Sequence, residues 1–128
     1  MPIRFKVIER GEPGVPGGGV KKFYATQVLM GELNFDDLTT LIEKVCTVHG
    51  ADIRAVLYAL VDVSLRELAN SEAIRMQDLG SIRINISSEG VSTPEEVDAN
   101  CITDSKFIFV PGKRLKELLE NLTFEKVE

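Results

Sequence analysis

Three basic residues near the end of the chain have the types and spacing needed to bind a phosphate. Lys113, Arg114 and Lys116 follow a Pro-Gly step and open the segment 113–119, whose leucines have helical spacing. The start of a helix leaves backbone N–H groups without partners, and basic side chains beside them favour an anion. The competing interpretation is a solvated helix face with ion pairs between residues four apart, such as Lys113 with Glu117. The residues alone leave both interpretations open.

Catalytic and metal-binding chemistry lack the residues that they need. Cys46 and Cys101 lie far apart and His49 is the single histidine, a count that excludes Cys/His metal sites and indicates two free thiols. No nucleophile or orienting acid can be assigned to His49, so it is interpreted as a residue at a helix start. Glu95 and Glu96 are adjacent, and neighbours on an extended chain point to opposite sides, so a solvated loop is expected there. The sequence predicts no catalytic residue, no metal and no cofactor.

Glycine-rich phosphate loops are also not expected. Gly17-Gly18-Gly19 precedes a predicted strand, whereas a phosphate loop needs a helix N-terminus behind it. The sequence has no G-x-S-x-G, Walker A or G-x-G-x-x-G motif. We therefore expect a protein that is not an enzyme and has no small-molecule substrate.

Composition is that of a soluble globular protein with a core of its own. The chain has 128 residues, of which 44% are apolar and 27% charged. It has neither a spanning apolar run nor the apolar stretch of a signal peptide, so a cytoplasmic protein without membrane contact is expected. Fifteen basic and 20 acidic residues give a net charge of −5, which by itself argues against a polyanionic partner. The acids concentrate in the middle, however, because residues 71–105 carry seven acids and two bases.

These residues are placed by elements in an α+β order. Period-two alternation and turn residues predict strands, whereas apolar residues three and four apart predict helices. Asn34 is a suitable N-cap for the first helix. The expected elements are strands at 3–8 and 21–30 around a Gly/Pro-rich turn at 11–19, helices at 34–48 and 52–70, strands at 74–76, 81–86 and 106–110 around a polar turn-rich segment at 87–105, a helix from 113, and a trailing extension at 124–127.

The second predicted helix carries apolar residues on more than one face. In so small a protein, one neighbouring helix cannot cover such a surface, which indicates a partner chain. We therefore predict a homodimer whose interface is formed by Leu41, Val45, Leu57, Leu60, Val61 and Leu65.

Three stretches carry a resemblance to a known family. They are the helix pair that begins at LNFDD, the strand-turn-strand IRMQDLGSIRI, and FVPGKRLK, which is similar to a Phe-Lys-Pro-Gly-Lys-Ala-Leu-Lys entry to a last helix. From Leu33 to Gly112 the chain thus resembles the HU and integration host factor family of bacterial nucleoid DNA-binding proteins. The stretches MPIRFKV and SSEGVSTPEEV point to a Bacteroides-type HU-like branch with extra N-terminal strands.

The resemblance implies an intertwined homodimer with a helix-turn-helix base, an antiparallel β saddle over DNA and a C-terminal helix. It divides the chain into an N-terminal β-hairpin extension at 1–32 and an HU-like domain at 33–128. In the family, a basic β-ribbon arm wraps the minor groove and a proline wedges between base pairs, where Pro94 could stand here. It also implies a location in the cytoplasm, at the nucleoid.

The chain departs from the family pattern in the arm. Residues 85–105 contain no Lys or Arg, against five acids, Glu89, Glu95, Glu96, Asp98 and Asp104. Like charges repel phosphates, so strong wrapping by the arm is not expected. The residues predicted to contact DNA are those of the saddle, Arg75, Arg83, Lys106, Lys113, Arg114 and Lys116, with Lys21 and Lys22 as further candidates.

Two hypotheses follow. The first is a non-enzymatic HU-like protein that binds double-stranded DNA weakly and without sequence preference, through phosphates. The alternative is an HU-fold dimer that has lost DNA binding and acts as a protein-interaction or structural module. Fold resemblance alone does not decide between them.

Overall fold

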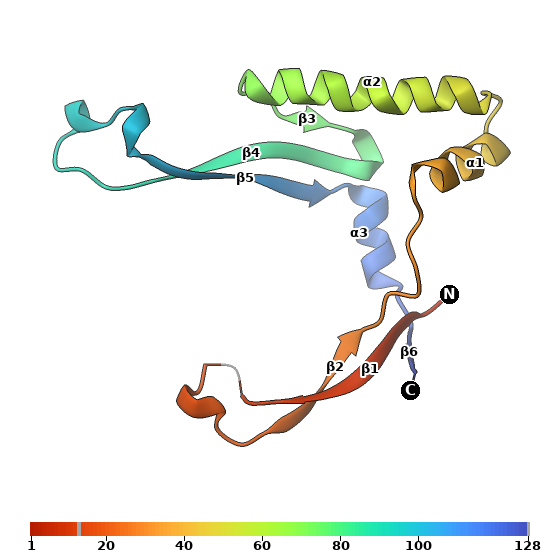
Figure 1. The fold of residues 1–128 in the computed structure, drawn as a ribbon, viewed down its shortest axis with the longest axis horizontal. Helices are drawn as coiled ribbons and strands as arrows, with labels where there is room; N and C mark the ends of the chain where they lie inside the picture. The colour runs from red at the N-terminus through yellow and green to blue at the C-terminus, as the bar shows by residue number, and fades with distance from the viewer. Residues whose placement is uncertain (13, 128) are drawn as a thin grey trace. The chain divides into compact units, whose positions relative to one another are not determined.

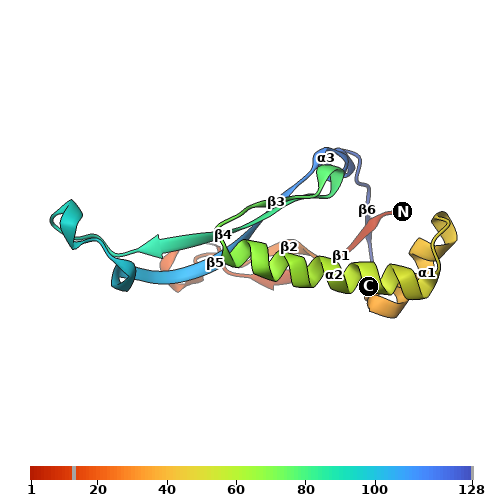
Figure 2. The same ribbon diagram turned by 90° about the horizontal axis from the view of Figure 1, so that it is seen from above.

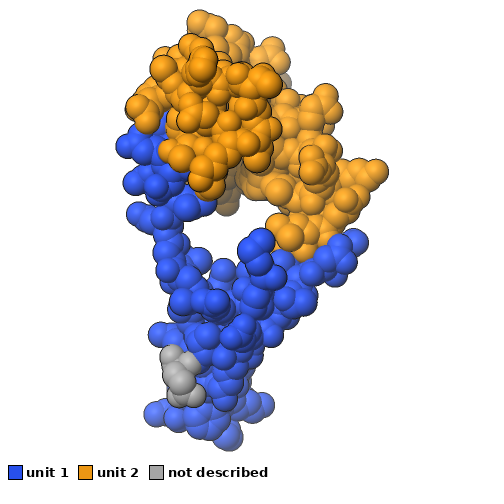
Figure 3. Space-filling view, turned by 90° about the vertical axis from the view of Figure 1, so that its right-hand side faces the viewer, with its two compact units in different colours: residues 1–38, 120–128 blue, residues 39–119 orange. Residues whose placement is uncertain are grey.

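Alternating apolar and polar side chains at the start of the chain form strand β1 (Ile3–Arg10), which pairs antiparallel with β2 (Lys22–Gln27). The computed structural model describes residues 1–12 and 14–127 (Figure 1). It divides into two compact units, residues 1–38 with 120–128 and residues 39–119 (Figure 3).

The predicted hairpin of β1 and β2 is confirmed, although its second strand is shorter than the predicted range 21–30. The turn between the strands includes a short 3-10 helix at Pro16–Gly18.

The end of the chain does not trail off as predicted. It forms strand β6 (Phe124–Lys126), which pairs in parallel with β1, Ile3 opposite Phe124. The N-terminal sheet therefore has the order β2-β1-β6. A three-residue stretch after a helix carries little periodic signal, so the sequence could not reveal this long-range pairing.

Helix α1 (Phe35–Val45) begins at the predicted cap. The backbone N–H of Asp37 donates to Asn34 Oδ1 at 2.8 Å, and the N–H of Asn34 donates to Asp37 Oδ2 at 3.1 Å. This reciprocal pair satisfies N–H groups that the first helical turn leaves without partners.

Helix α2 (Gly50–Ala69) follows α1 after a four-residue break. It starts two residues before the predicted Asp52, with His49 as its N-cap residue, as predicted. The N–H of Gly50 donates to Glu43 Oε2 at 2.6 Å, so a side chain of α1 anchors the start of α2.

The second sheet has the order β3-β4-β5 and is antiparallel throughout. Its strands are β3 (Ile74–Arg75), β4 (Gly80–Ser88) and β5 (Ile102–Pro111). The segment 102–105 was predicted as part of a polar loop, but it continues β5 opposite β4, because backbone pairing extends beyond the apolar residues. The β4–β5 ribbon runs away from α3 and ends in an arm tip, residues 89–101, with two short 3-10 turns (Figure 2).

Helix α3 (Lys113–Glu120) is held at its start by two glycines. The N–H of Gly112 donates to the carbonyl of Leu79 at 3.3 Å. A Cβ on Gly112 would overlap the carbonyl of Asp78, and one on Gly80, whose φ is +128°, would overlap the carbonyl of Val110. Only glycine permits this close approach of the two backbones.

The chain buries few apolar side chains by itself. Among the described residues, the buried apolar side chains are Ile53, Leu68 and Cys101, together with the polar Thr39. None of the described helices is both long and apolar enough to cross a membrane.

Candidate nucleic-acid interface

The strand register brings the three predicted strand bases to one face of the β3-β4-β5 sheet. Residues directly opposite each other on paired strands share a face, and every second residue along a strand returns to it. Arg75 lies opposite Ser81, two residues before Arg83. Arg83 in turn lies two residues before Asn85, which is opposite Lys106. All three side chains belong to exposed residues. The sequence-predicted bases of β3, β4 and β5 therefore form one set, which we call the basic sheet face.

The other face of the same sheet is apolar. Ile82 lies opposite Phe109 and Ile84 opposite Phe107, with Ile74 of β3 beside Ile82. Phe107 is 65% exposed and Phe109 is 53% exposed. The sheet thus has one apolar side and one side that carries the three bases.

The bases of α3 lie in its first turn, as predicted. Lys113, Arg114 and Lys116 are all exposed, and the N–H of Lys116 makes the first helical hydrogen bond, to the carbonyl of Gly112, at 2.9 Å. Val110 of β5 lies on the basic sheet face, opposite Ser81, and Lys113 begins α3 three residues after it. Arg114 lines a cavity of about 330 Å³ with Asp78 and Leu79, which places it beside the turn between β3 and β4.

The competing ion pairs within α3 are not formed. Among residues 1–12 and 14–127, the side chains of Lys113, Arg114 and Lys116 take part in no ion pair or hydrogen bond. Positive charges without partners at a helix start are unfavourable toward the helix dipole unless an anion binds there. These three side chains are therefore exposed at the helix start without an ion-pair partner among the described residues.

The arm tip is ordered but acidic. The N–H of Glu89 donates to the carbonyl of Cys101 at 2.9 Å and closes the ribbon. Cys101 is buried there, with Sγ 3.6 Å from the carbonyl oxygen of Glu96. Thr93 Oγ1 donates to Glu96 Oε1 at 3.1 Å, and the N–H of Asn100 donates to Asp98 Oδ1 at 2.9 Å. The arm tip therefore has a fixed shape, and it presents carboxylates where the family pattern presents bases.

The predicted dimer residues lie on α1 and α2 and leave much of their surface open. Val45 is 84% exposed, Leu65 61%, Val61 50% and Leu60 42%. Leu41 is exposed as well, and Leu57 is half-buried. Within residues 1–12 and 14–127, five of these six side chains are therefore left largely uncovered.

A second group of bases lies outside the predicted site. Arg4, Lys6 and Arg10 alternate along β1, and Lys22 of β2 lies opposite Arg10. Of this hairpin, the sequence reading singled out the bases at 21 and 22 alone. The period-two pattern of residues 3–10 was the available signal, since it places every second residue on the same face.

The comparisons with known proteins agree on the fold. The structure of this chain is similar to that of a "putative bacterial DNA binding protein" from Bacteroides vulgatus ATCC 8482, with a TM-score of 0.67 and 11% sequence identity. The likeness covers 98% of this chain and 48% of the other, so this chain spans about half of its length. No curated protein is significantly similar in sequence. Residues 1–126 match the family described as "HU domain fused to wHTH, Ig, or Glycine-rich motif". Because the match covers nearly the whole chain, the resemblance to HU proteins is confirmed, and the chain belongs to this HU-HIG family.

Proposed function

We propose that the chain is a non-enzymatic DNA-binding protein that contacts double-stranded DNA through the basic sheet face and the first turn of α3. The observation that carries the proposal is the register, which collects the bases Arg75, Arg83 and Lys106 on one face of the sheet, whereas both phenylalanines of β5 lie on the other. The family and the DNA-binding description of the Bacteroides protein support it. The location that fits this function is the nucleoid, in the cytoplasm.

The functional form is a homodimer in this proposal. The exposed apolar residues of α1 and α2, Leu41, Val45, Leu57, Leu60, Val61 and Leu65, provide the interface. A second copy would also cover the apolar side of the β3-β4-β5 sheet, which the chain leaves open. In this arrangement residues 33–128 form the HU-like domain and residues 1–32 the β extension, with β6 as the strand by which the domain joins the extension's sheet.

Binding is expected to be weak and indifferent to sequence. Lysine and arginine on a sheet face reach phosphates, which carry no sequence information. The acidic arm adds no counterion release and repels the duplex, so the arm does not wrap it.

The experiment is a fluorescence anisotropy titration of a labelled duplex between about 50 and about 200 mM salt. The variant K113Q/R114Q/K116Q removes three positive charges per protomer, and K44Q/R54Q/R66Q removes the same number from helices α1 and α2. Each lost phosphate contact lowers the slope of log K against log salt by about 0.9. We expect a slope smaller by about 3 per protomer for the first variant and little change for the control. Equal slopes in both variants would refute the proposed site.

The alternative function, a protein-interaction module, is favoured by one observation, the ordered arm tip with its carboxylates. A native chain that fails to bind duplex at about 50 mM salt, where phosphate contacts are strong, would select this alternative.

A further inference from the structure

We propose that the β1–β2 hairpin is a second DNA-contacting element, a cationic ribbon separate from the basic sheet face. This inference rests on the proposed function, because it takes DNA as the partner. It assigns to the N-terminal extension a role that the fold alone does not give it.

The charges of the two ribbons in the chain are opposite. Residues 1–27, which form β1, the turn and β2, contain five bases and two acids, Glu9 and Glu12. Residues 85–105, which form most of the β4–β5 ribbon, contain five acids and no base. A two-stranded ribbon fits the major groove, and its affinity for a duplex comes largely from phosphate neutralisation. Of the two ribbons, the N-terminal one has the charge that this needs.

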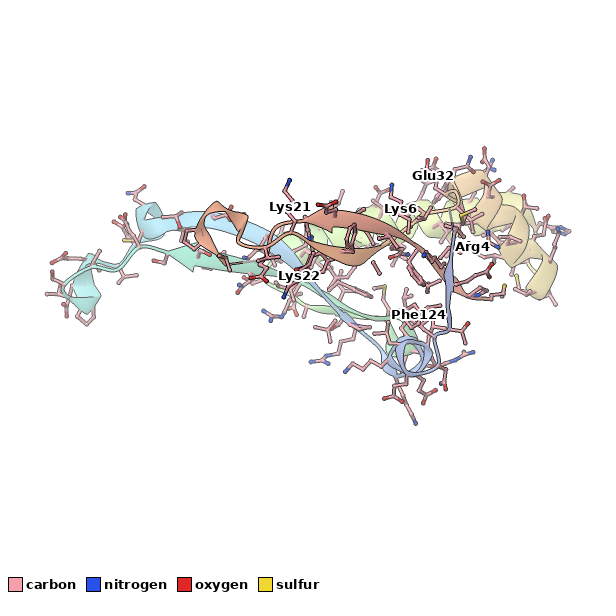
Figure 4. The ribbon with its side chains drawn as sticks, turned by 90° about the horizontal axis from the view of Figure 1, so that it is seen from below. Arg4, Lys6, Lys21, Lys22, Glu32 and Phe124 are labelled. Atoms are coloured by element: carbon pink, nitrogen blue, oxygen red, sulfur yellow. The ribbon has the colours of Figure 1, made fainter. Side chains whose placement is uncertain are left out.

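The bases of the hairpin are available to a ligand. Lys6, Arg10, Lys21 and Lys22 are exposed, and Figure 4 shows Arg4, Lys6, Lys21 and Lys22 distributed along the ribbon. Lys6 and Lys21 form no ion pair or side-chain hydrogen bond among residues 1–12 and 14–127.

The acids of the hairpin do not cancel this charge. Glu12 Oε1 is held by Lys22 Nζ at 2.8 Å, so one carboxylate is neutralised by one of the five bases. The guanidinium of Arg10 lies 4.6 Å from the centroid of the Tyr24 ring, which holds that cation on the ribbon surface without removing its charge. Besides Arg10 and Lys22, residues 1–27 contain three more bases and a single further acid, Glu9. The hairpin therefore keeps a net positive charge.

The bases of the hairpin are spaced so that they can contact several phosphates of a DNA backbone. Arg4 and Lys6 are two residues apart on one strand, which separates them by about 7 Å. Arg10 and Lys22 lie opposite each other on neighbouring strands. Charges repeated along and across a ribbon contact several phosphates at once, so we expect the hairpin to add to the salt dependence of binding without adding sequence preference.

The test uses the full chain and the variant K6Q/K21Q, which changes the two exposed lysines without side-chain partners. K44Q/R66Q is the matched control, because it removes the same charge from α1 and from α2, outside the sheet that contains the hairpin. Two phosphate contacts account for about a tenfold difference in affinity between about 50 and about 200 mM salt. We expect the salt-induced loss of affinity to be about tenfold smaller per protomer for K6Q/K21Q than for the native chain, which is about a hundredfold for the proposed dimer, and unchanged for the control.

The outcomes separate this inference from the proposed function. If K6Q/K21Q behaves like its control while K113Q/R114Q/K116Q loses salt dependence, the hairpin inference is wrong and the proposed site stands. If the α3 variant still binds and K6Q/K21Q does not, the hairpin inference stands alone. If K6Q/K21Q changes only self-association in sedimentation, the ribbon binds the acidic arm of another copy, and the inference of DNA contact is overturned.

Discussion

The substitution Leu60→Asp tests the dimer on which the proposed saddle depends. Leu60 lies in the middle of α2 and is 42% exposed in the single chain. At about 100° per residue Leu57, Leu60, Val61 and Leu65 spread over an arc of about 140°, and Ala59 lies outside that arc, about 100° from Leu60 on the other side. In the proposed dimer, Leu60 from both copies is buried at the interface.

The expected loss of dimer stability is large because the substitution is present in both copies. Burying the open part of one leucine contributes about 1 kcal/mol, and an unpaired carboxylate in an apolar interface costs several kcal/mol. Two copies together give a loss of about 6 kcal/mol or more, which raises the dissociation constant of the dimer by about 10⁴ or more.

Sedimentation velocity over a range of protein concentrations measures this loss directly. The native chain should sediment as a dimer, Leu60→Asp as a monomer or an unfolded chain, and the control Ala59→Asp as a dimer. Circular dichroism on the same samples separates monomer from unfolded chain. A stable folded monomer of the native sequence, or a dimer of Leu60→Asp as tight as that of Ala59→Asp, would refute the reasoning.

Three further predictions concern the elements that position the site. Gly112→Ala should lower the free energy of unfolding by about 2 kcal/mol, because the new Cβ overlaps the backbone of the β3–β4 turn, whereas Gly90→Ala, which meets no atom within 4 Å, should be nearly neutral in thermal unfolding. Asn34→Ala should cost about 1 kcal/mol in chemical denaturation through the lost cap of α1, and a cost near zero would show that the cap is not required. E95K/E96K should tighten duplex binding and steepen its salt dependence, because the arm then attracts phosphates, whereas an unchanged affinity in the same titration would place the arm away from DNA.

The order of the elements could be predicted where periodicity was long and uninterrupted. The α1 cap at Asn34, the helix start at His49 and the strand character of β3, β4 and β5 follow from local patterns of caps and alternation, whereas the antiparallel arrangement of those strands was implied by the family resemblance. Local signals were sufficient for the caps and the strand character because each of these features is determined by residues close in sequence.

Features that depend on distant pairing could not be predicted in the same way. Strand β6 forms because Phe124 pairs with Ile3, which is more than a hundred residues away in the sequence. A strand of three residues is too short to show a periodic pattern. The polar residues 102–105 predict a loop, yet they form part of a strand because β4 provides hydrogen-bonding partners opposite them. For the site, the identity of the basic residues was readable from the sequence, but their common face required the register.

The net charge of −5 is a poor guide to this chain, because four of the five acids of residues 85–105 lie in the arm tip, and only Asp104 shares the basic sheet face with Lys106. The acids of the arm tip project from one end of the β4–β5 ribbon, whereas the bases at 75, 83 and 106 occupy one face of the same sheet. A phosphate at the basic sheet face interacts with charges within about 10 Å, the screening length at about 0.1 M salt, far more than with the distant arm. An acidic protein can therefore hold a cationic face, and the acidic arm restricts which parts of the protein approach DNA without preventing the approach. In the proposed function, this separation allows a chain of net negative charge to contact DNA through one sheet face while its arm tip carries carboxylates.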